Sequence, residues 1–599
     1  MRFKSAVVGG YQALAVSGVN TVSFAIDFAL ANTKGLLGFA VEREDPKEKE
    51  RYYMRGFKVF PSVVPHPDKD TEASTFDQPV QSFVWDDFTA KPGRTYHYYF
   101  HPLKGTPKNL DRSAKAVKIT VRTEPQFKAG EEHDIFFNRG VASSQAYARE
   151  FDNKAPDDPS LSPAEREKAL QWLSRELDEA MLKFIQQAKA GDTLLGCFYE
   201  FRYLPVLEAL KAALDRKVNL RLIIDAKVNE FTDKAGFHES FPREQNLSML
   251  KAAKIPLKNV VLLREARPSD IQHNKFMVLL KGKAAQPTAV WTGSTNLSMG
   301  GIHGQANVGH WVRNAAVAEK YRDYWQLLSG DPGGQASDTR SDVLKKNKQL
   351  KTDVEAVLPT PVDWHNIPSG ITPVFSPRAG SGVLEMYASM LDGAQDLACV
   401  TLAFGINKLF KELLKDNTAQ NALAFLLLEK QDKPDKRSTQ PFIRINASNN
   451  VYQAWGSFLR EPLDQWAKET SAGVLKLNTH VSFIHCKFLL MDPLGADPIV
   501  VTGSANFSDA STNDNDENML LIRGSKRVAD IYFTEFNRLF NHYYFRSVVE
   551  ATAKARQAGE PPPKDGSLEL TEDDTWLKKY ARGKLRFKRV QVFVKMNGV

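Results

Sequence analysis

The sequence predicts an α/β fold in which two pseudo-two-fold related α-β-α repeats follow a small all-β sandwich. A short pattern, a histidine and a lysine two residues apart on an apolar strand and then Gly-Ser-x-Asn, starts at His273 and again at His485. The apolar segments before each copy follow the same order, with helix-like stretches between them. Residues 1–125 instead hold short apolar segments separated by polar turns. These three observations divide the chain into a β module and two repeats.

The N-terminal module, residues 1–125, has the segment spacing typical of a β-sandwich. Its predicted strands span residues 13–18, 21–28, 36–41, 56–60, 82–85, 95–100 and 116–121. The turn at 91–96 resembles the entry to a late strand of fibronectin type III-like domains. We interpret the aromatic strand 95–100 as sandwich core rather than as a base-stacking surface. Such modules more often position a partner or pack on a neighbour than perform chemistry, so a protein partner could bind here.

The two repeats are expected at 130–330 and 371–550, joined by a mostly polar linker at 331–370. Apolar strands separated by helices predict a largely parallel sheet that is buried on both faces. In the first repeat we expect one long amphipathic helix over 163–188, strands at 194–199 and 220–225, and a helix at 205–214 between them. Strands at 398–404 and 422–427 correspond to them in the second repeat, which places Cys197 and Cys399 at matching positions.

The first repeat is longer than the second. Arg139 and His273 are 134 residues apart, whereas Arg378 and His485 are 107 residues apart. The difference places an insertion near 155–172, which we expect close to the mouth of the pocket.

The C-terminal extension, 551–599, starts with the prolines 561–563 and ends in a basic stretch. Residues 586–594 alternate in polarity, which predicts a β segment packed on another domain rather than a free tail.

Composition limits the classes of function. At 599 residues the chain should hold two to four domains. A net charge of +9 favours an anionic partner, either nucleic acid or a phospholipid surface, although a mildly basic enzyme with neither partner fits as well. No apolar run reaches the length of a transmembrane helix. Three distant cysteines make a disulfide framework and a zinc knuckle improbable, and we expect a cytoplasmic location.

The repeated pattern carries the chemistry. If the repeats pack about a pseudo-two-fold axis, His273 and His485 can face each other across one pocket. Hydrogen-bond donors from both copies suit a phosphodiester oxyanion; they are Lys275, Ser294, Asn296, Lys487, Ser504 and Asn506. One histidine would attack phosphorus and form a phosphohistidine, while the other would protonate the leaving alkoxide and then activate water. These donors can neutralise the phosphoryl oxygens unaided, so we expect no metal and no cofactor.

The pattern resembles that of the phospholipase D superfamily, His-x-Lys-x-x-x-x-Asp followed by Gly-Ser-x-Asn, over about residues 130–550. The second copy includes the aspartate, Asp492, whereas the first has Leu280 at that position. Glu517 resembles the family's trailing glutamate, whose carboxylate supports the catalytic imidazole. In the first copy Ala306-Asn307 replaces the Glu-Asn pair, with Gln305 beside it. Family convention makes the first histidine the nucleophile, but the carboxylate argument makes His485 the more basic imidazole. The sequence leaves this assignment open.

The resemblance also bears on the substrate. The superfamily includes phospholipases, phospholipid synthases and nucleases. Phe507-Ser508 and the Glu517-Asn518 pair look most like its bacterial nuclease branch, which implies a metal-independent hydrolase or endonuclease that binds nucleic acid. The first alternative is phospholipase D-type hydrolysis or transphosphatidylation of phospholipids. The second is a non-catalytic nucleic-acid-binding protein that keeps the fold.

Overall fold

Two β-sheets form the N-terminal module of the computed structural model, which describes residues 1–65, 71–140, 147, 150–228, 241–417, 422–434, 441–456, 483–557 and 569–598. The first sheet has the order β1 (Arg2–Lys4), β2 (Tyr11–Ser17), β3 (Val22–Phe28) and β8 (Val84–Asp87). The second contains β10 (Asn109–Asp111), β9 (Thr95–Thr106), β4 (Gly38–Asp45) and β5 (Glu50–Tyr53), with β11 (Val117–Arg122) also pairing with β9. Tyr96, Tyr98 and Phe100 are buried, which confirms the interpretation of this strand as core.

The predicted strand 56–60 is largely absent. Only its first residue belongs to a strand, the two-residue β6 (Arg55–Gly56), which pairs with β7 (Ala73–Ser74). Val59 and Phe60 are buried although they lie outside any regular strand. Val59 forms an isolated β-bridge with Glu569 near the C-terminus.

Each repeat is built on a seven-stranded sheet, and the two sheets have the same strand order. The first runs β12 (His133–Phe137), β18 (Val308–Val312), β17 (Gln286–Gly293), β16 (Lys275–Lys281), β13 (Thr193–Phe198), β14 (Asn219–Asp225) and β15 (Val261–Arg264). The second runs β19 (Gly370–Ser376), β25 (Glu517–Arg523), β24 (Ile499–Gly503), β23 (Phe488–Met491), β20 (Leu397–Leu402), β21 (Leu423–Leu428) and β22 (Val451–Trp455). This identity of order confirms the internal repeat.

The expectation of largely parallel sheets is wrong. Only β13–β14–β15 and β20–β21–β22 are parallel, and the other neighbouring pairs in both sheets are antiparallel. Strands joined by a short turn, such as β16 and β17, cannot run parallel because a parallel return needs a long crossover. Burial of the central strands on both faces is as expected.

The cysteine correspondence also needs correction. Cys197 pairs with Phe276, three residues after His273, whereas Cys399 pairs with Leu490, five residues after His485. The residue of the second repeat that corresponds to Cys197 is therefore Thr401. The two cysteines lie on corresponding strands but two residues apart in register.

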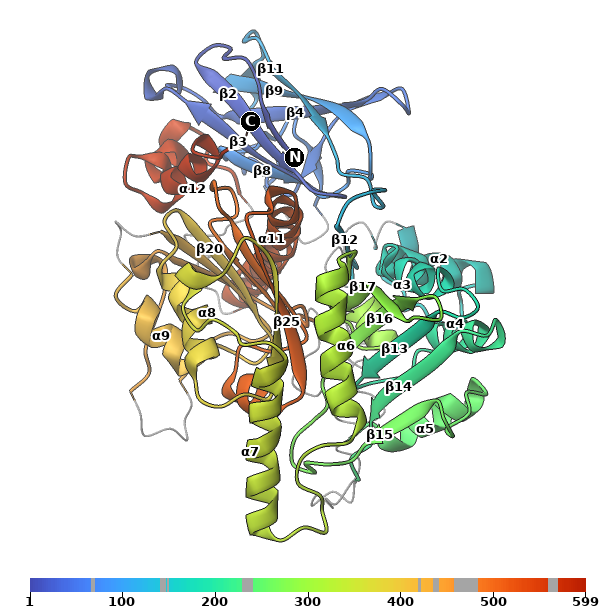
Figure 1. Cartoon of the computed structure of the whole chain (residues 1–599). Coiled ribbons are helices and arrows are strands. Elements are labelled where there is room, and N and C mark those ends of the chain that lie inside the picture. The colour runs from blue at the N-terminus through green and yellow to red at the C-terminus, as the bar shows by residue number, and fades with distance from the viewer. Residues whose placement is uncertain are drawn as a thin grey trace.

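Helices cover the outer faces of the sheets and fill the space between them (Figure 1). They are α2 (Pro163–Ser174), α3 (Leu177–Gln186), α4 (Leu204–Asp215), α5 (Arg243–Ala252), α6 (Ala315–Ser329), α7 (Arg340–Val357), α8 (Gly382–Asp392), α9 (Lys408–Leu414), α11 (Lys526–Gln557) and α12 (Leu585–Val594). Helix α6 contacts β17 and β19, and α11 contacts β12, β22 and β2. Both helices therefore link the two repeats, and α11 also reaches the N-terminal sheets.

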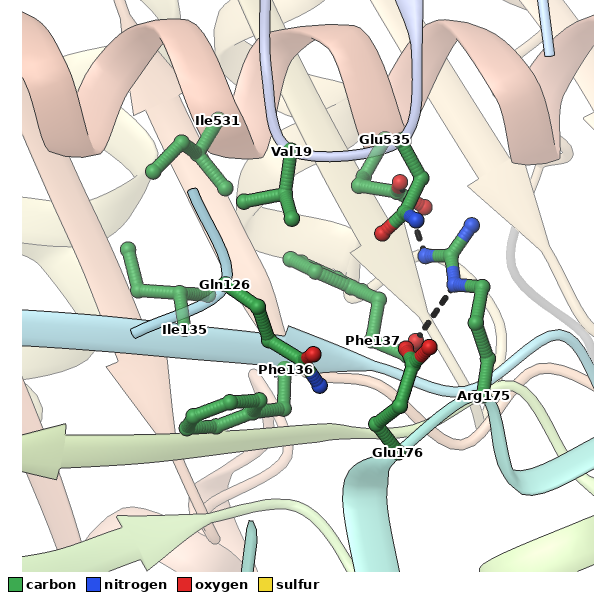
Figure 2. Close-up of a pocket in the computed structure, with 10 residues that line it drawn as sticks. Val19, Gln126, Ile135, Phe136, Phe137, Arg175, Glu176, Ile531 and Glu535 are labelled. Atoms are coloured by element: carbon green, nitrogen blue, oxygen red, sulfur yellow. Dashed lines mark hydrogen bonds and ion pairs between the residues drawn. The ribbon is translucent and has the colours of Figure 1, made fainter. Parts of the chain in front are cut away.

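The predicted helix 163–188 is two helices. Residues Arg175 and Glu176, between α2 and α3, have φ angles of 44° and 65°, in the left-handed region. The break is held by the buried Arg175 side chain, which donates to the carbonyl oxygen of Phe137 at 2.9 Å and pairs with Glu535 on α11 at 2.8 Å. Figure 2 shows both contacts beside a cavity of about 10 Å³, roughly the space of one water. Side-chain contacts that a helical period does not encode thus interrupt this helix.

The inserted segment lies beside the first Gly-Ser-x-Asn turn. Helix α2, which makes up much of it, packs against the helical turn Gly300–Gly304. The carbonyl oxygen of Leu170 faces Nδ1 of His303 at 3.1 Å.

Two further segments differ from expectation. The linker 331–370 contains the 18-residue helix α7, capped by the Thr339 side chain and anchored by buried Leu350 and Val354. Residues 586–594 lie in helix α12 rather than in a strand, because Val590 and Phe593, three apart, are buried on one side. The prolines 561–563 lie outside the described residues.

Buried ion pairs attach the N-terminal module to α11. Arg2 pairs with Asp530 at 2.9 Å and donates to the carbonyl oxygens of Pro493 and Leu494. Arg527 pairs with Glu124 at 2.9 Å. In the part of the chain that the structure describes, no helix is long and apolar enough to cross a membrane.

Candidate active site

The two predicted histidines face each other where the sheets meet. Their ring centroids are 6.4 Å apart, with the ring planes at 76°. Lys275 is opposite Phe198, the last residue of β13, so His273 lies at the carboxyl edge of the parallel strands. The register of β23 against β20 places His485 at the same edge of the second sheet. This edge is where open α/β sheets bind ligands.

Each histidine is supported by a residue of the other repeat. The Nδ1 atom of His273 lies 2.8 Å from a carboxylate oxygen of Glu517, and that of His485 lies 2.9 Å from the amide oxygen of Asn307. The expectation that Glu517 makes His485 the better supported histidine is therefore wrong. Glu517 follows the second motif in sequence, but it supports the histidine of the first.

Backbone hydrogen bonds produce this exchange. The amide of His273 donates to the carbonyl oxygen of Asp516, and the amide of His485 donates to that of Ala306. Asp516 directly precedes Glu517, and Ala306 directly precedes Asn307. Each backbone bond therefore brings the supporting residue of one repeat next to the histidine of the other. Both acceptors fix the Nδ1–H tautomer, which leaves each Nε2 available for chemistry.

The motif serines hold the supporting side chains. Ser294 donates to the Asn307 amide oxygen at 2.7 Å, and Ser504 donates to the other carboxylate oxygen of Glu517 at 2.6 Å. Asn307 also donates to the carbonyl oxygen of Gly301 at 2.8 Å, which fixes the orientation of its amide. The serines thus position acceptors rather than face a substrate.

The glycines of the motif permit a close approach between strands. A Cβ atom on Gly293 would lie 2.2 Å from the carbonyl oxygen of Val308, and one on Gly503 would lie 2.2 Å from that of Asn518. Their φ angles, 142° and 159°, also disfavour a side chain. Glycine is therefore required where each serine turns towards the site.

The lysines and asparagines bring polar groups to the same place. Lys275 and Lys487 are buried, and each donates to the carbonyl oxygen of the histidine two residues before it at 2.5 Å. The amide oxygens of Asn296 and Asn506 are buried without a hydrogen-bond partner in the described structure. The site therefore holds two lysine amino groups and two amides whose oxygen atoms are unpaired among the described residues.

Asp492 binds backbone groups at the start of a neighbouring strand. Its carboxylate accepts the backbone N–H groups of Gln395, Asp396 and Leu397 at 2.8 to 3.0 Å. It thereby fastens the start of β20 to the end of β23, and the buried Leu280 of β16 makes no such bonds.

Sequence reasoning missed three residues near the histidines. The Tyr199 ring lies edge-on to the His273 ring, with centroids 5.2 Å apart. The buried Glu200 accepts from the Asn296 amide at 2.9 Å and pairs with Arg202 at 2.9 Å. Both follow β13, and a polar pair just after a buried parallel strand was an available signal.

The third missed residue is Asn138, which is fully buried. Its side chain accepts the backbone N–H of Asn307 at 2.8 Å and donates to the carbonyl oxygens of Ile302 and Gln305. Asn138 therefore holds the residue that supports His485. No motif marks it, because its partners lie more than 160 residues away.

Burial lowers the proton affinity of the site. It lowers the pKa of His273 to about 4 despite the opposing effect of Glu517, and that of Lys275 to about 8. Burial followed by the charges of Lys487 and Lys275 lowers the pKa of His485 well below its ordinary value. The free site therefore holds neutral imidazoles among mutually repelling lysines, an environment suited to an anion. Among the described residues, no cluster of three or more His, Cys, Asp or Glu could hold a metal ion.

A family model described as "Cardiolipin synthase, PLD-like domain" matches residues 181–328 and 398–540, one match in each repeat. The chain belongs to the phospholipase D superfamily. None of the curated proteins compared with this superfamily member matches it. The family makes the chain a phosphodiesterase-class enzyme and leaves its substrate open.

Solved structures resemble this phospholipase D superfamily member at low identity. Phosphatidylserine synthase from Haemophilus influenzae is 11% identical with a TM-score of 0.39, over 71% of this chain and 93% of that one. Nuc from Salmonella typhimurium, a phospholipase D family member, is 17% identical with a TM-score of 0.19, over 29% and 95%. Polyphosphate kinase from Porphyromonas gingivalis is 10% identical with a TM-score of 0.36, over 58% of this chain and only 42% of that one.

Proposed function

We propose that this protein is a metal-independent nuclease that hydrolyses phosphodiester bonds through a phosphohistidine on His273. The observation that carries the mechanism is the unequal support of the two facing imidazoles. A carboxylate stabilises a histidine that must carry positive charge while bonded to phosphorus. His273 has that carboxylate, and His485 has a neutral amide.

In the first step Nε2 of His273 attacks phosphorus, and the bond from phosphorus to the leaving oxygen breaks. His485, protonated in the substrate complex, gives its Nε2 proton to the leaving alkoxide. The anionic substrate raises the proton affinity of His485 because it offsets the charges of Lys275 and Lys487. Attack and protonation thus come from opposite sides of one phosphoryl group.

In the second step the now neutral His485 takes a proton from water. The water oxygen bonds to phosphorus, the N–P bond breaks, and His273 returns to its neutral form. The two ammonium groups and the amide N–H groups of Asn296 and Asn506 donate hydrogen bonds to the phosphoryl oxygens in both steps. Loss of one such donor costs on the order of 100- to 1,000-fold in rate.

Nucleic acid is the proposed substrate. The net charge of +9 supports a polyanionic partner, because Lys and Arg neutralise phosphates along a bound strand. Residues Phe507-Ser508, which resemble those of the nuclease branch, support the same choice.

Phospholipid is the second candidate, and one observation favours it. Four exposed apolar side chains follow strands that end at the edge of the candidate site; they are Leu204, Val228, Met299 and Phe404. Phe404 is 57% exposed and comes two residues after β20. Side chains of this kind around a pocket would suit a membrane surface.

Two parallel assays test the substrate. We expect the protein to nick supercoiled plasmid in EDTA and to release no choline from phosphatidylcholine vesicles. Choline release without nicking would transfer the proposal to the lipid candidate. If nicking stops in EDTA and returns with added Mg²⁺ or Zn²⁺, the metal-independent mechanism is wrong. The His273→Ala variant is the control for a contaminating nuclease.

A further inference from the structure

A groove of about 410 Å³, whose lining includes neither histidine, lies between β22, the middle of α11 and the start of α12. Its lining includes Tyr452 and Trp455 of β22, Tyr544 of α11 and Arg586 of α12. Its volume is in the range of ligand pockets, and its lining combines aromatic rings with a cation.

The aromatic rings at the groove are held in place from behind. One face of Tyr452 stacks on Phe425 of β21, with ring centroids 4.8 Å apart and planes at 14°. Among the described residues β22 is the outermost strand of its sheet, so the other face of Tyr452 is turned away from β21, towards the groove. The ring of Tyr544, a residue that is 37% exposed, lies nearly parallel to the ring of Phe540. The two ring centroids are 6.2 Å apart and the ring planes make an angle of 10°. Two aromatic stacks therefore end at this groove.

The charge beside the groove is positive. Residues 575–599 contain eight Lys and Arg and no Asp or Glu. Arg586 lines the groove, and Lys588 and Arg589 follow it on α12. Ring faces beside basic side chains are the combination with which proteins hold single-stranded nucleic acid, because every base has a face to stack and every link has a phosphate.

The groove also begins at the edge of the sheet that carries the catalytic histidines. Trp455 ends β22 opposite Leu428, and Glu429 directly follows Leu428. The carboxylate of Glu429 accepts the N–H of Ile484 at 2.8 Å, and Ile484 precedes His485. A strand leaving the site along this edge would therefore reach the groove.

We propose that this groove is an accessory site for single-stranded nucleic acid, in which a base stacks on Tyr452 and Tyr544 and an adjacent phosphate meets Arg586. The proposal rests on the proposed nuclease function, whose substrate class it narrows. A binding assay separates it from that function, because binding can be measured without cleavage.

The experiment compares Tyr544→Ala and Arg586→Gln with Lys345→Gln, which removes the same charge from an exposed position on α7. The probe is a fluorescein-labelled 20-residue oligothymidylate, and its dissociation constant is measured by anisotropy in EDTA, with each change made in a His273→Ala background. Loss of one stacked base should weaken binding about tenfold or more. Arg586→Gln should reduce the slope of log affinity against log salt by about one. Lys345→Gln should match the parent.

Cleavage provides the second readout, in the background that retains His273. Tyr544→Ala and Arg586→Gln should slow oligothymidylate cleavage and leave hydrolysis of bis(p-nitrophenyl) phosphate unchanged, because that substrate is too small to reach the groove. Unchanged oligonucleotide affinity in both variants would overturn the groove proposal, even if the parent cleaves the probe. If binding is lost in the variants but the parent never cleaves the probe, the groove proposal holds and the nuclease proposal fails. If Tyr544→Ala and Arg586→Gln sediment less with anionic phosphatidylglycerol vesicles than the parent does, at unchanged oligonucleotide affinity, the groove binds lipid. That result would overturn the proposal of a nucleic-acid site.

Discussion

At the scale of single residues, the difference between a carboxylate and an amide distinguishes two otherwise similar histidines. Glu517 and Asn307 occupy corresponding places after the two motifs, and each is held by a motif serine. Only Glu517 can stabilise a cationic imidazole by charge, and it does so for His273. The two imidazoles therefore differ chemically because Glu517 lies behind one ring and Asn307 behind the other.

This asymmetry predicts which variant accumulates a covalent intermediate. With bis(p-nitrophenyl) phosphate, whose leaving group needs no acid, His485→Ala should release one equivalent of p-nitrophenolate and retain the remaining p-nitrophenyl phosphoryl group on His273. His273→Ala should show neither, because it lacks the nucleophile. Intact-protein mass spectrometry after rapid acid-free quenching measures the adduct. An adduct in His273→Ala and none in His485→Ala would reverse the proposed roles.

The pH dependence follows from the same two residues. The productive free enzyme needs neutral His273 and protonated His485. Because the pKa of His485 is lowered, its protonated fraction falls about tenfold per pH unit above that pKa, so kcat/KM for an oligonucleotide should fall as the pH rises from 5 to 8. Below a pH of about 4 the increase in kcat/KM towards low pH should stop, because His273 becomes protonated and can no longer attack.

Asn307→Asp provides the matched test of this pH dependence. A carboxylate behind His485 would raise its pKa and shift the fall in kcat/KM to higher pH. A profile that is flat between pH 5 and 8, or unchanged in Asn307→Asp, would contradict the assignment of His485 as the acid.

At the scale of elements, the motif aspartate holds strands together. Asp492 satisfies three backbone N–H groups ahead of β20. We expect Asp492→Ala to lower the free energy of unfolding by about 1 to 3 kcal/mol, because those groups lose their acceptor. The kcat of the folded variant should stay within about twofold of the parent. Urea denaturation and steady-state kinetics measure both, and a large loss of kcat at unchanged stability would place Asp492 in the chemistry instead.

Elements also show where sequence patterns were insufficient. The sequence predicts one helix over 163–188, but the Arg175–Glu535 pair lies outside that pattern and divides the helix. Residues 586–594 alternate like a strand over a few positions, and the packing of Val590 and Phe593 selects a helix. Short apolar patterns fit both periods, and tertiary contacts decide between them.

At the scale of the whole molecule, sequence reasoning anticipated the repeat and the motif residues that meet at its centre. Two copies of one pattern were enough to place His273, Lys275, His485 and Lys487 together, because corresponding strands of a repeat end at corresponding places. The exchange of supporting residues was not visible, since it depends on bridges between Asp516 and Gln272 and between Ala306 and Ile484, more than 170 residues apart. Sequence spacing carries no information on such pairings.

The exchange of Glu517 and Asn307 makes the two repeats interdependent for activity. A repeat isolated from its partner keeps its own histidine and lysine but loses the group that sets the tautomer of that histidine. The competent unit is therefore the packed pair, and neither repeat can acquire or lose its half of the reaction independently. A mutation that loosens the seam between the repeats would disable nucleophile and acid together, although it touches neither.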